Sequence, residues 1–144
     1  MQSYHLDKLK IGDSVWMEKT VSETDIYNYA GITGDFSSLH VNEERAKNSR
    51  FGRRIAHGML LAGFISAVLG TQLPGIGTIY VSQSIKFLKP VYIGDTVRAQ
   101  VEVIEIDSVK RRVKLKTTCT NQQGEDVLIG EAVVIPPSSA KSVK

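Results

Sequence analysis

The sequence predicts an α+β domain in which a curved antiparallel β-sheet wraps around one long α-helix. Two observations lead to this prediction. Residues 56–70 are apolar on nearly every side of a helix, and we expect such a helix to be buried on all sides. One strand-like segment precedes this run and four follow it, with alternating apolar and polar residues between turns. In a chain of 144 residues, wrapping the sheet around the helix is the economical way to bury it.

The part of the chain before the long helix is expected to form one strand and two shorter helices. Residues 14–21 alternate as a strand does. Ser22 then precedes acidic residues placed as in a first helical turn, so we expect a helix over residues 24–32. Asn42 can cap a further short helix over residues 43–48.

The part after the long helix is expected to complete the sheet with strands over residues 78–88, 96–106, 109–120 and 126–135. Such a sheet has exposed edges, and edge pairing in a homodimer is a common way to cover them. The third of these strands alternates most cleanly. Its predicted inward residues are Val113, Leu115, Thr117 and Cys119, and its outward, solvated residues are Lys110, Arg112, Lys114 and Lys116.

Residues 1–136 are expected to form one domain, and residues 137–144 a polar, disordered tail. Lysines and arginines are scattered and the net charge is only +3, which argues against a nucleic-acid partner. With Cys119 as its one cysteine, the chain has neither a disulfide framework nor a cysteine-based zinc site. It shows no signal-peptide pattern and no apolar run of the roughly 20 residues that a membrane span needs. We therefore expect a cytoplasmic protein.

Two segments contain the residue types of an enzyme site. The first, Gly34-Asp35-Phe36-Ser37-Ser38-Leu39-His40, has the composition of a turn, which can bring Asp35 and His40 together. A continuous helix would separate these two side chains by roughly 140° around its axis. The second places His57-Gly58 at the start of the long helix, where unpaired backbone N–H groups suit a developing negative charge. Together they offer an acid–base pair and an oxyanion donor.

These motifs, in this order, resemble those of the MaoC-like, (R)-specific enoyl-CoA hydratases of hot-dog fold. The resemblance extends over nearly the whole chain, from about Ile11 to Ile135. Its motifs are Gly34-Asp35 with His40, Ile55 with His57-Gly58-Met59-Leu60, Tyr80 to Phe87, Lys89-Pro90-Val91-Tyr92-Ile93-Gly94-Asp95, and Gly130-Glu131-Ala132.

The resemblance implies a homodimer that adds water reversibly, in syn fashion, to a trans-2-enoyl-CoA and gives an (R)-3-hydroxyacyl-CoA. It implies that Asp35 and His40 hold and activate the water and manage the proton for C2. The backbone N–H of Gly58 would bind the thioester oxygen, and Ser66 matches a position near the acyl pocket. It implies no metal and no separate cofactor, because CoA is part of the substrate.

The sequence departs from the family pattern at one point. The family usually has Asp-x-Asn-Pro-x-His, whereas Ser37-Ser38 stand here in place of Asn-Pro. Without proline the turn loses a φ constraint, and Ser37 can reproduce only some of the local hydrogen bonds of asparagine.

Each candidate residue also has a plain structural interpretation. Asp35 alone fits an Asx-turn, and His40 alone fits a half-buried structural histidine. For His57 we favour a structural role at the helix start over a ligand contact. Ser66 is more often a packing residue than a substrate contact. Asp35, His40 and His57 lack the i, i+4 histidine pair of helical zinc sites, so a metal triad is not expected.

Three other functions stay open from the sequence. A dehydratase acting on acyl-carrier-protein thioesters would differ only in the carrier. A thioesterase would use Asp35 to direct water at the carbonyl carbon instead of C3. A non-catalytic acyl-CoA-binding protein would bind CoA esters without turning them over.

Overall fold

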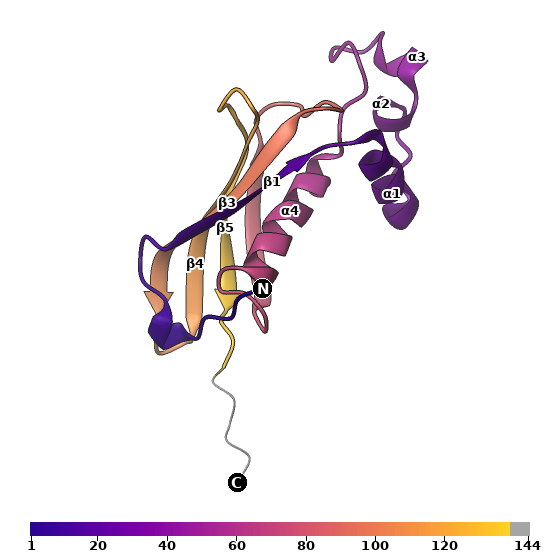
Figure 1. Ribbon diagram of the computed structural model, residues 1–144. Coiled ribbons are helices and arrows are strands. Elements are labelled where there is room, and N and C mark those ends of the chain that lie inside the picture. Colours follow the sequence, from indigo (N-terminus) through magenta and orange to yellow (C-terminus); the bar gives the residue numbers. More distant parts are fainter. Residues whose placement is uncertain (139–144) are drawn as a thin grey trace.

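Five strands form one antiparallel sheet, and the longest helix packs against one face of it (Figure 1). The computed structural model describes residues 1–138. The strands are β1 (Ser14–Thr20), β2 (Ile79–Phe87), β3 (Thr96–Asp107), β4 (Arg112–Thr120) and β5 (Asp126–Ile135). The helices are η1 (Leu6–Lys8, a 3₁₀ turn), α1 (Glu23–Thr33), α2 (Ser38–Val41), α3 (Glu43–Ala46) and α4 (Gly58–Thr71).

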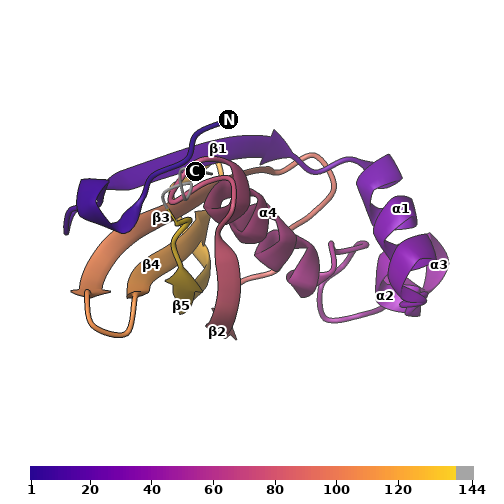
Figure 2. The same ribbon diagram turned by 90° about the horizontal axis from the view of Figure 1, so that it is seen from below.

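The strand order is β1-β3-β4-β5-β2, and every neighbouring pair is antiparallel. Leu115 of β4 lies opposite Val103 of β3 and Ala132 of β5, and all three are fully buried. The four residues of β4 that were expected to point inward are buried, which confirms the predicted alternation. The view from below shows the sheet curving around α4, as predicted (Figure 2).

Helix α4 is buried on one side only. Its inner side consists of Leu61, Phe64, Ile65, Val68 and Leu69. The expectation that it would be buried all round is wrong for the single chain, because the sheet covers only the side that faces it. The residues exposed on the other side are Met59, Gly63, Ser66, Ala67 and Gly70.

Strand β2 lies at the edge of the sheet and pairs only with β5. Of its apolar residues Ile79, Val81, Ile85 and Phe87, only Ile85 is partly buried. Val81 lies between the paired residues Tyr80 and Ser82 at an irregularity in the ladder. An apolar edge strand thus borders the exposed side of α4.

The three helices between β1 and α4 form an insert at one end of the sheet, close to the start of α4 (Figures 1 and 2). Helix α1 begins with the predicted cap, because Asp25 N–H donates to Ser22 Oγ at 3.1 Å and Ser22 N–H donates to Asp25 Oδ2 at 2.9 Å. Asn42 caps α3 as predicted, although α3 ends two residues early, at Ala46. The insert therefore has well-defined boundaries set by its caps.

The chain after β5 stays in contact with the domain for two further residues. Pro136 and Pro137 are buried, and the Pro137 carbonyl oxygen lies 3.1 Å from Nδ1 of His5. Residues 139–144 of the expected disordered tail lie outside the described residues. Within residues 1–138, no helix is long and apolar enough to cross a membrane.

Candidate active site

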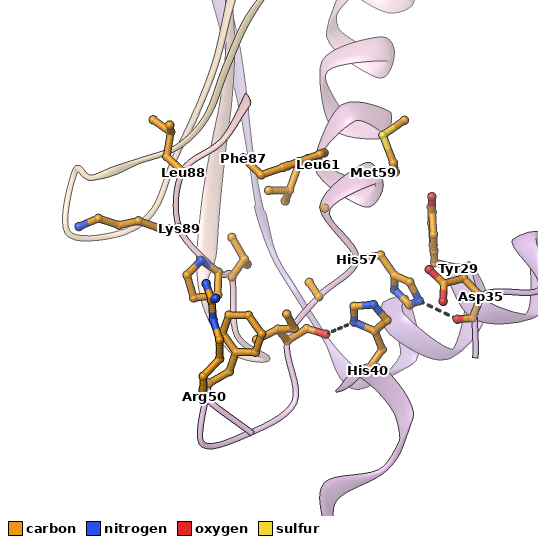
Figure 3. A pocket seen from close by; sticks show the side chains of 16 residues that line it. Tyr29, Asp35, His40, Arg50, His57, Met59, Leu61, Phe87, Leu88 and Lys89 are labelled. Atoms are coloured by element: carbon orange, nitrogen blue, oxygen red, sulfur yellow. Dashed lines mark hydrogen bonds between the residues drawn. The ribbon is translucent and has the colours of Figure 1, made fainter. Parts of the chain in front are cut away.

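A cavity of about 390 Å³ lies where the insert, the start of α4 and the segment after β2 meet (Figure 3). It contains four of the five residues that the sequence singled out, namely Asp35, His40, His57 and Gly58. These residues come from two separate stretches of the chain. The fold thus gathers the two segments that were expected to form the site.

Asp35 is placed by the turn that ends α1. Gly34 closes the helix with φ +82°, a conformation that glycine adopts readily, and its N–H donates to the Ala30 carbonyl at 2.8 Å. Asp35 Oδ1 then accepts from the Ser37 N–H at 3.2 Å, which is an Asx-turn. The turn therefore forms with serine in the position of the family's asparagine. The structural interpretation of Asp35 is correct, but the same turn also puts its carboxylate in the cavity.

His40 belongs to α2 and is half-buried. Its Nδ1 lies 2.7 Å from the carbonyl oxygen of Ile55. A carbonyl can only accept, so Nδ1 carries the proton of the neutral ring and Nε2 keeps a lone pair. This hydrogen bond fixes both the orientation of the ring and the nitrogen that is left to act as a base.

His57 is almost completely buried, at 2% exposure, and precedes the first residue of α4. Its Nε2 donates to the backbone carbonyl of Asp35 at 2.9 Å. Its ring stacks on His40, with centroids 3.9 Å apart, and lies 4.5 Å from the ring of Tyr29. These contacts support the structural role that we favoured, because His57 ties the Asp35 turn to the start of α4.

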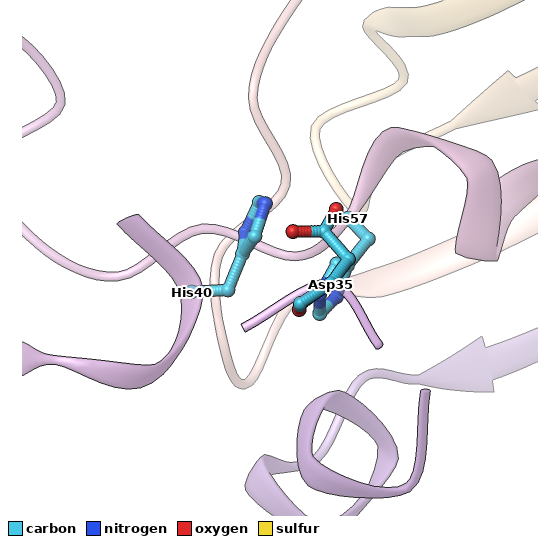
Figure 4. Close-up of side chains that lie close together, drawn as sticks. All are labelled: Asp35, His40 and His57. Carbon is cyan, nitrogen blue, oxygen red and sulfur yellow. The ribbon is translucent and has the colours of Figure 1, made fainter. Parts of the chain in front are cut away.

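The three side chains lie close together (Figure 4). One nitrogen or oxygen atom from each of Asp35, His40 and His57 can be chosen so that all three atoms lie within 4.8 Å of one another. The sequence spacing argued against a metal triad, yet the fold brings these groups within reach of one cation. In each of the two histidines, one ring nitrogen is hydrogen-bonded to a backbone carbonyl. The pair of Asp35 and His40 is sufficient for acid–base chemistry without a metal.

Gly58 is the first residue of α4, and its backbone N–H donates to no acceptor among residues 1–138. The start of a helix of 14 residues also places the positive end of the helix dipole at this point. A Cβ added to Gly58 would lie 2.7 Å from Cε1 of Phe87. A side chain at this position would therefore displace the Phe87 ring or the start of α4, and Gly58 itself lines the cavity.

A family model described as MaoC like domain matches residues 9–124, which is more than half of the chain. The chain belongs to the MaoC-like domain family. An (R)-specific enoyl-CoA hydratase of Rhodospirillum rubrum is 52% identical over 135 residues, covering 94% of this chain and 93% of that protein. A mitochondrial 3-hydroxyacyl-[acyl-carrier-protein] dehydratase of Solanum lycopersicum is 37% identical over 132 residues, covering 90% of this chain and 79% of that protein.

The fold of this MaoC-like domain matches a solved structure closely. An R-hydratase of Pseudomonas aeruginosa in the unliganded form superimposes with a TM-score of 0.91 at 36% identity, covering 96% of this chain and 88% of that chain. The hot-dog fold that the resemblance implied is thereby confirmed. The family assignment made from separated motifs is confirmed as well.

In this MaoC-like domain, Ser66 lies away from the cavity that contains Asp35 and His40. It follows Gly58 by eight residues along α4, which corresponds to about 12 Å of helix rise. It lines a second hollow on the exposed side of α4, together with residues of β2. Met59 borders both cavities, so the two hollows adjoin each other along α4.

Several residues of the cavity were not singled out from the sequence. Tyr29 lies within the helix predicted over residues 24–32, and Lys89-Pro90-Val91 belongs to a motif of the resemblance, but neither was assigned to the site. Arg50 and Phe51 gave no signal, because they lie in a segment without regular periodicity. The residues missed are Tyr29, Arg50, Phe51, Phe87, Lys89 and Pro90.

Proposed function

We propose that this protein is an (R)-specific enoyl-CoA hydratase, a hydro-lyase that adds water reversibly to a trans-2-enoyl-CoA. The observation that supports this most directly is the pairing of Asp35 with a His40 ring whose Nε2 keeps a lone pair, in a cavity that also contains Gly58. The relative from Rhodospirillum rubrum adds support, because its 52% identity extends over 94% of this chain.

In the hydration direction, the Asp35 carboxylate and His40 Nε2 hold one water molecule against C3 of the substrate. As the water oxygen bonds to C3, this pair takes a proton from the water, and the electrons of the C2–C3 double bond move toward the thioester oxygen. C2 then takes a proton from the same pair of residues. Because both groups approach from one side of the substrate, hydroxyl and proton add to the same face.

The thioester oxygen gains negative charge in this step and needs a hydrogen-bond donor. The Gly58 N–H at the start of α4 meets this need, since it has no acceptor within residues 1–138. Base, acid and oxyanion donor are then all groups of the protein. The proposal therefore includes no metal and no separate cofactor, and CoA enters as part of the substrate.

The proposed enzyme is a cytoplasmic homodimer. Strand β2 has an unpaired edge, and its exposed apolar residues border the uncovered side of α4. A second copy of the chain would cover both surfaces at once and would bring the partner next to Met59, at the border of the catalytic cavity. The single thiol, which is buried and free, agrees with a reducing compartment.

Loss of the enoyl absorbance of crotonyl-CoA tests the proposal, with free thiol and product stereochemistry measured in the same samples. The expected result is loss of absorbance without thiol release, giving the (R)-3-hydroxy product. Thiol release would identify a thioesterase instead. Tight binding of crotonyl-CoA without turnover would identify a binding protein. The (S) product would contradict the assigned geometry.

The second candidate is a dehydratase acting on acyl-carrier-protein thioesters. The relative from Solanum lycopersicum, a 3-hydroxyacyl-[acyl-carrier-protein] dehydratase, favours it. Its chemistry at C2 and C3 would be the same. Competition between crotonyl-CoA and crotonyl-carrier protein at equal concentration separates the two. We expect the CoA ester to be hydrated in preference.

A further inference from the structure

The mouth of the catalytic cavity contains an arginine whose charge is not neutralised by the protein. Arg50 lines the cavity, is exposed, and lies within salt-bridge distance of no carboxylate among residues 1–138. Arg54 and Arg98, in contrast, are both paired with glutamates. Arg50 thus offers its guanidinium to an anion from outside the chain.

Two arginines in this segment lie beside aromatic rings, Arg50 at the cavity and Arg53 outside its lining. The guanidinium of Arg50 lies 5.0 Å from the ring centroid of its neighbour Phe51, which also lines the cavity and restricts the positions that the arginine can adopt. Arg53 stacks on Tyr92 at 3.9 Å and likewise has no carboxylate partner within the described part of the chain. Two guanidinium groups held near aromatic rings are therefore available within four residues.

Lys89 completes the basic end from the segment after β2. It lines the same cavity and is paired with Glu125, and the side chains of both residues are about half exposed. An exposed pair of this kind is weak, and an ammonium group has three donors, so Lys89 can still contact a second anion. Figure 3 shows Arg50 and Lys89 on the opposite side of the cavity from Asp35 and His57.

The cavity therefore has an acid–base end and a basic end, and its substrate should have a reactive group and an anion joined by a linker. Guanidinium groups bind phosphate oxygens in a bidentate fashion and stay charged at any physiological pH. We propose that Arg50, assisted by Arg53 and Lys89, forms a subsite for the diphosphate of a CoA thioester. This proposal rests on the proposed function and identifies the carrier by its phosphates.

The test compares crotonyl-CoA with crotonyl-phosphopantetheine and crotonyl-pantetheine, which share the acyl and pantetheine parts but carry fewer phosphates or none. We expect Arg50→Gln to raise KM for crotonyl-CoA about tenfold with little change in kcat, the order of one charge-assisted hydrogen bond. For crotonyl-pantetheine the change should stay below about twofold. Added NaCl should raise the KM of wild type for crotonyl-CoA more than it raises the KM of the variant.

Arg111→Gln is the matched control, because Arg111 is also exposed in a turn but lies at the β3–β4 end of the sheet, away from the insert. Arg111→Gln should leave the KM for crotonyl-CoA and the KM for crotonyl-pantetheine unchanged. Equal effects of Arg50→Gln on the CoA and pantetheine esters, or no effect on either, would overturn the subsite. If crotonyl-phosphopantetheine had the same KM as crotonyl-CoA, and Arg50→Gln raised both KM values equally, the site would bind a single phosphate. The diphosphate assignment would then be wrong.

Calorimetric titration with free CoA makes the result independent of turnover. If wild type hydrated no thioester, the proposed hydratase function would fail, yet the subsite would still predict CoA binding that Arg50→Gln weakens about tenfold. Equal binding of CoA by wild type and variant would overturn the subsite, whatever the activity. Melting temperatures of the three proteins check that the variants are folded.

Discussion

The side chains of Asp35 and His40 make different hydrogen bonds in the local structure. The proposed catalytic role of Asp35 can therefore be tested by a substitution that keeps its hydrogen bond. Among residues 1–138, the Asp35 side chain accepts one hydrogen bond, from the Ser37 N–H to Oδ1, and an asparagine can accept the same bond. His40 donates from Nδ1 to Ile55 and leaves Nε2 unprotonated. The first residue can therefore lose its charge without losing its turn.

We expect Asp35→Asn and His40→Ala each to lower kcat by about two orders of magnitude or more, because each removes one member of the acid–base pair. The melting temperature of Asp35→Asn should stay close to that of wild type. Steady-state hydration of crotonyl-CoA and a thermal melt measure the two quantities. Asp126→Asn, at the exposed start of β5, is the matched control. A near-normal rate from either site variant would refute the assigned roles.

Gly58 allows a different prediction, because its role depends on backbone access. A methyl group at this position would meet the Phe87 ring at 2.7 Å, so Gly58→Ala must displace the ring or the start of α4. We expect kcat to fall by at least about tenfold, as the oxyanion donor moves. In the Gly58→Ala/Phe87→Leu double variant, with the ring removed, part of the lost kcat should return. Failure of the second substitution to restore any activity would show that steric displacement is not the cause.

At the scale of elements, Arg54 joins the helical insert to the segment that leads into α4. Its side chain is 10% exposed, and its guanidinium donates to Glu23 of α1 at 2.5 Å, to Glu43 of α3 at 2.7 Å and to the Tyr27 hydroxyl at 3.0 Å. The next residue, Ile55, supplies the carbonyl that orients His40. Arg54 thus holds both sides of the catalytic turn together.

We expect Arg54→Gln to lower the free energy of unfolding by about 1–3 kcal/mol, since several charge-assisted hydrogen bonds are lost from a largely buried group. It should also lower kcat, because the insert that contains Asp35 and His40 is no longer held against Ile55. Denaturant unfolding and steady-state kinetics measure the two effects. Unchanged stability and unchanged kcat together would show that the insert is held by other contacts.

The same cluster predicts a pH dependence. Hydrogen bonds from Tyr27 and Arg54 lower the pKa of Glu23 below its ordinary 4.5. A carboxyl group with a lowered pKa in the folded state stabilises the fold above its unfolded pKa and loses that contribution as the pH falls through the folded pKa. Glu23→Gln should therefore lower the melting temperature at pH 7, and this effect should shrink as the pH falls through the lowered pKa of Glu23, below 4.5. Glu44→Gln, which breaks only an exposed pair with Lys47, should change little over the same pH range.

The elements of this fold could be predicted from local pattern, whereas their contacts across the chain could not. The Ser22 cap, the turn that begins at Gly34 and the alternation of β4 depend on neighbouring residues. The cap and the alternation are confirmed, and so is the first part of the turn, whereas residues 38–41 of the predicted turn and its continuation form the short helix α2. Which sides of α4 and β2 are exposed depends on which of their surfaces the rest of the fold covers. The pattern of apolar residues along each segment does not reveal this. Arg54 acquires its role only through Glu23, Tyr27 and Glu43, which lie 11 to 31 residues earlier in the sequence. Arg50 lies at the cavity only because the fold brings its segment there, so nothing in the sequence around either arginine marked it.

For the whole molecule, the uncovered apolar surface is the main feature that a single chain leaves unexplained. Val81 is 49% exposed on β2, and the adjoining side of α4, apart from Met59 at its start, is made of small residues. A Cβ added to Gly63 or Gly70 would meet no atom within 4 Å, so neither glycine serves close packing inside the chain. Small residues on an exposed helix side allow another surface to approach closely.

We expect wild type to be a dimer at micromolar concentration and Val81→Lys to be a monomer, measured by size-exclusion chromatography with light scattering. Val81 is unpaired in the β2–β5 ladder, so the substitution leaves the pairing within the chain intact. In a two-fold dimer formed through β2, it would bring two ammonium groups into one interface, which is unfavourable. Val109→Lys, at a 94% exposed position in the β3–β4 turn, is the control and should remain dimeric. Activity should fall with the dimer, because Met59 borders both the catalytic cavity and the uncovered surface. A monomeric wild type, or a dimeric Val81→Lys, would show that the partner does not bind along β2.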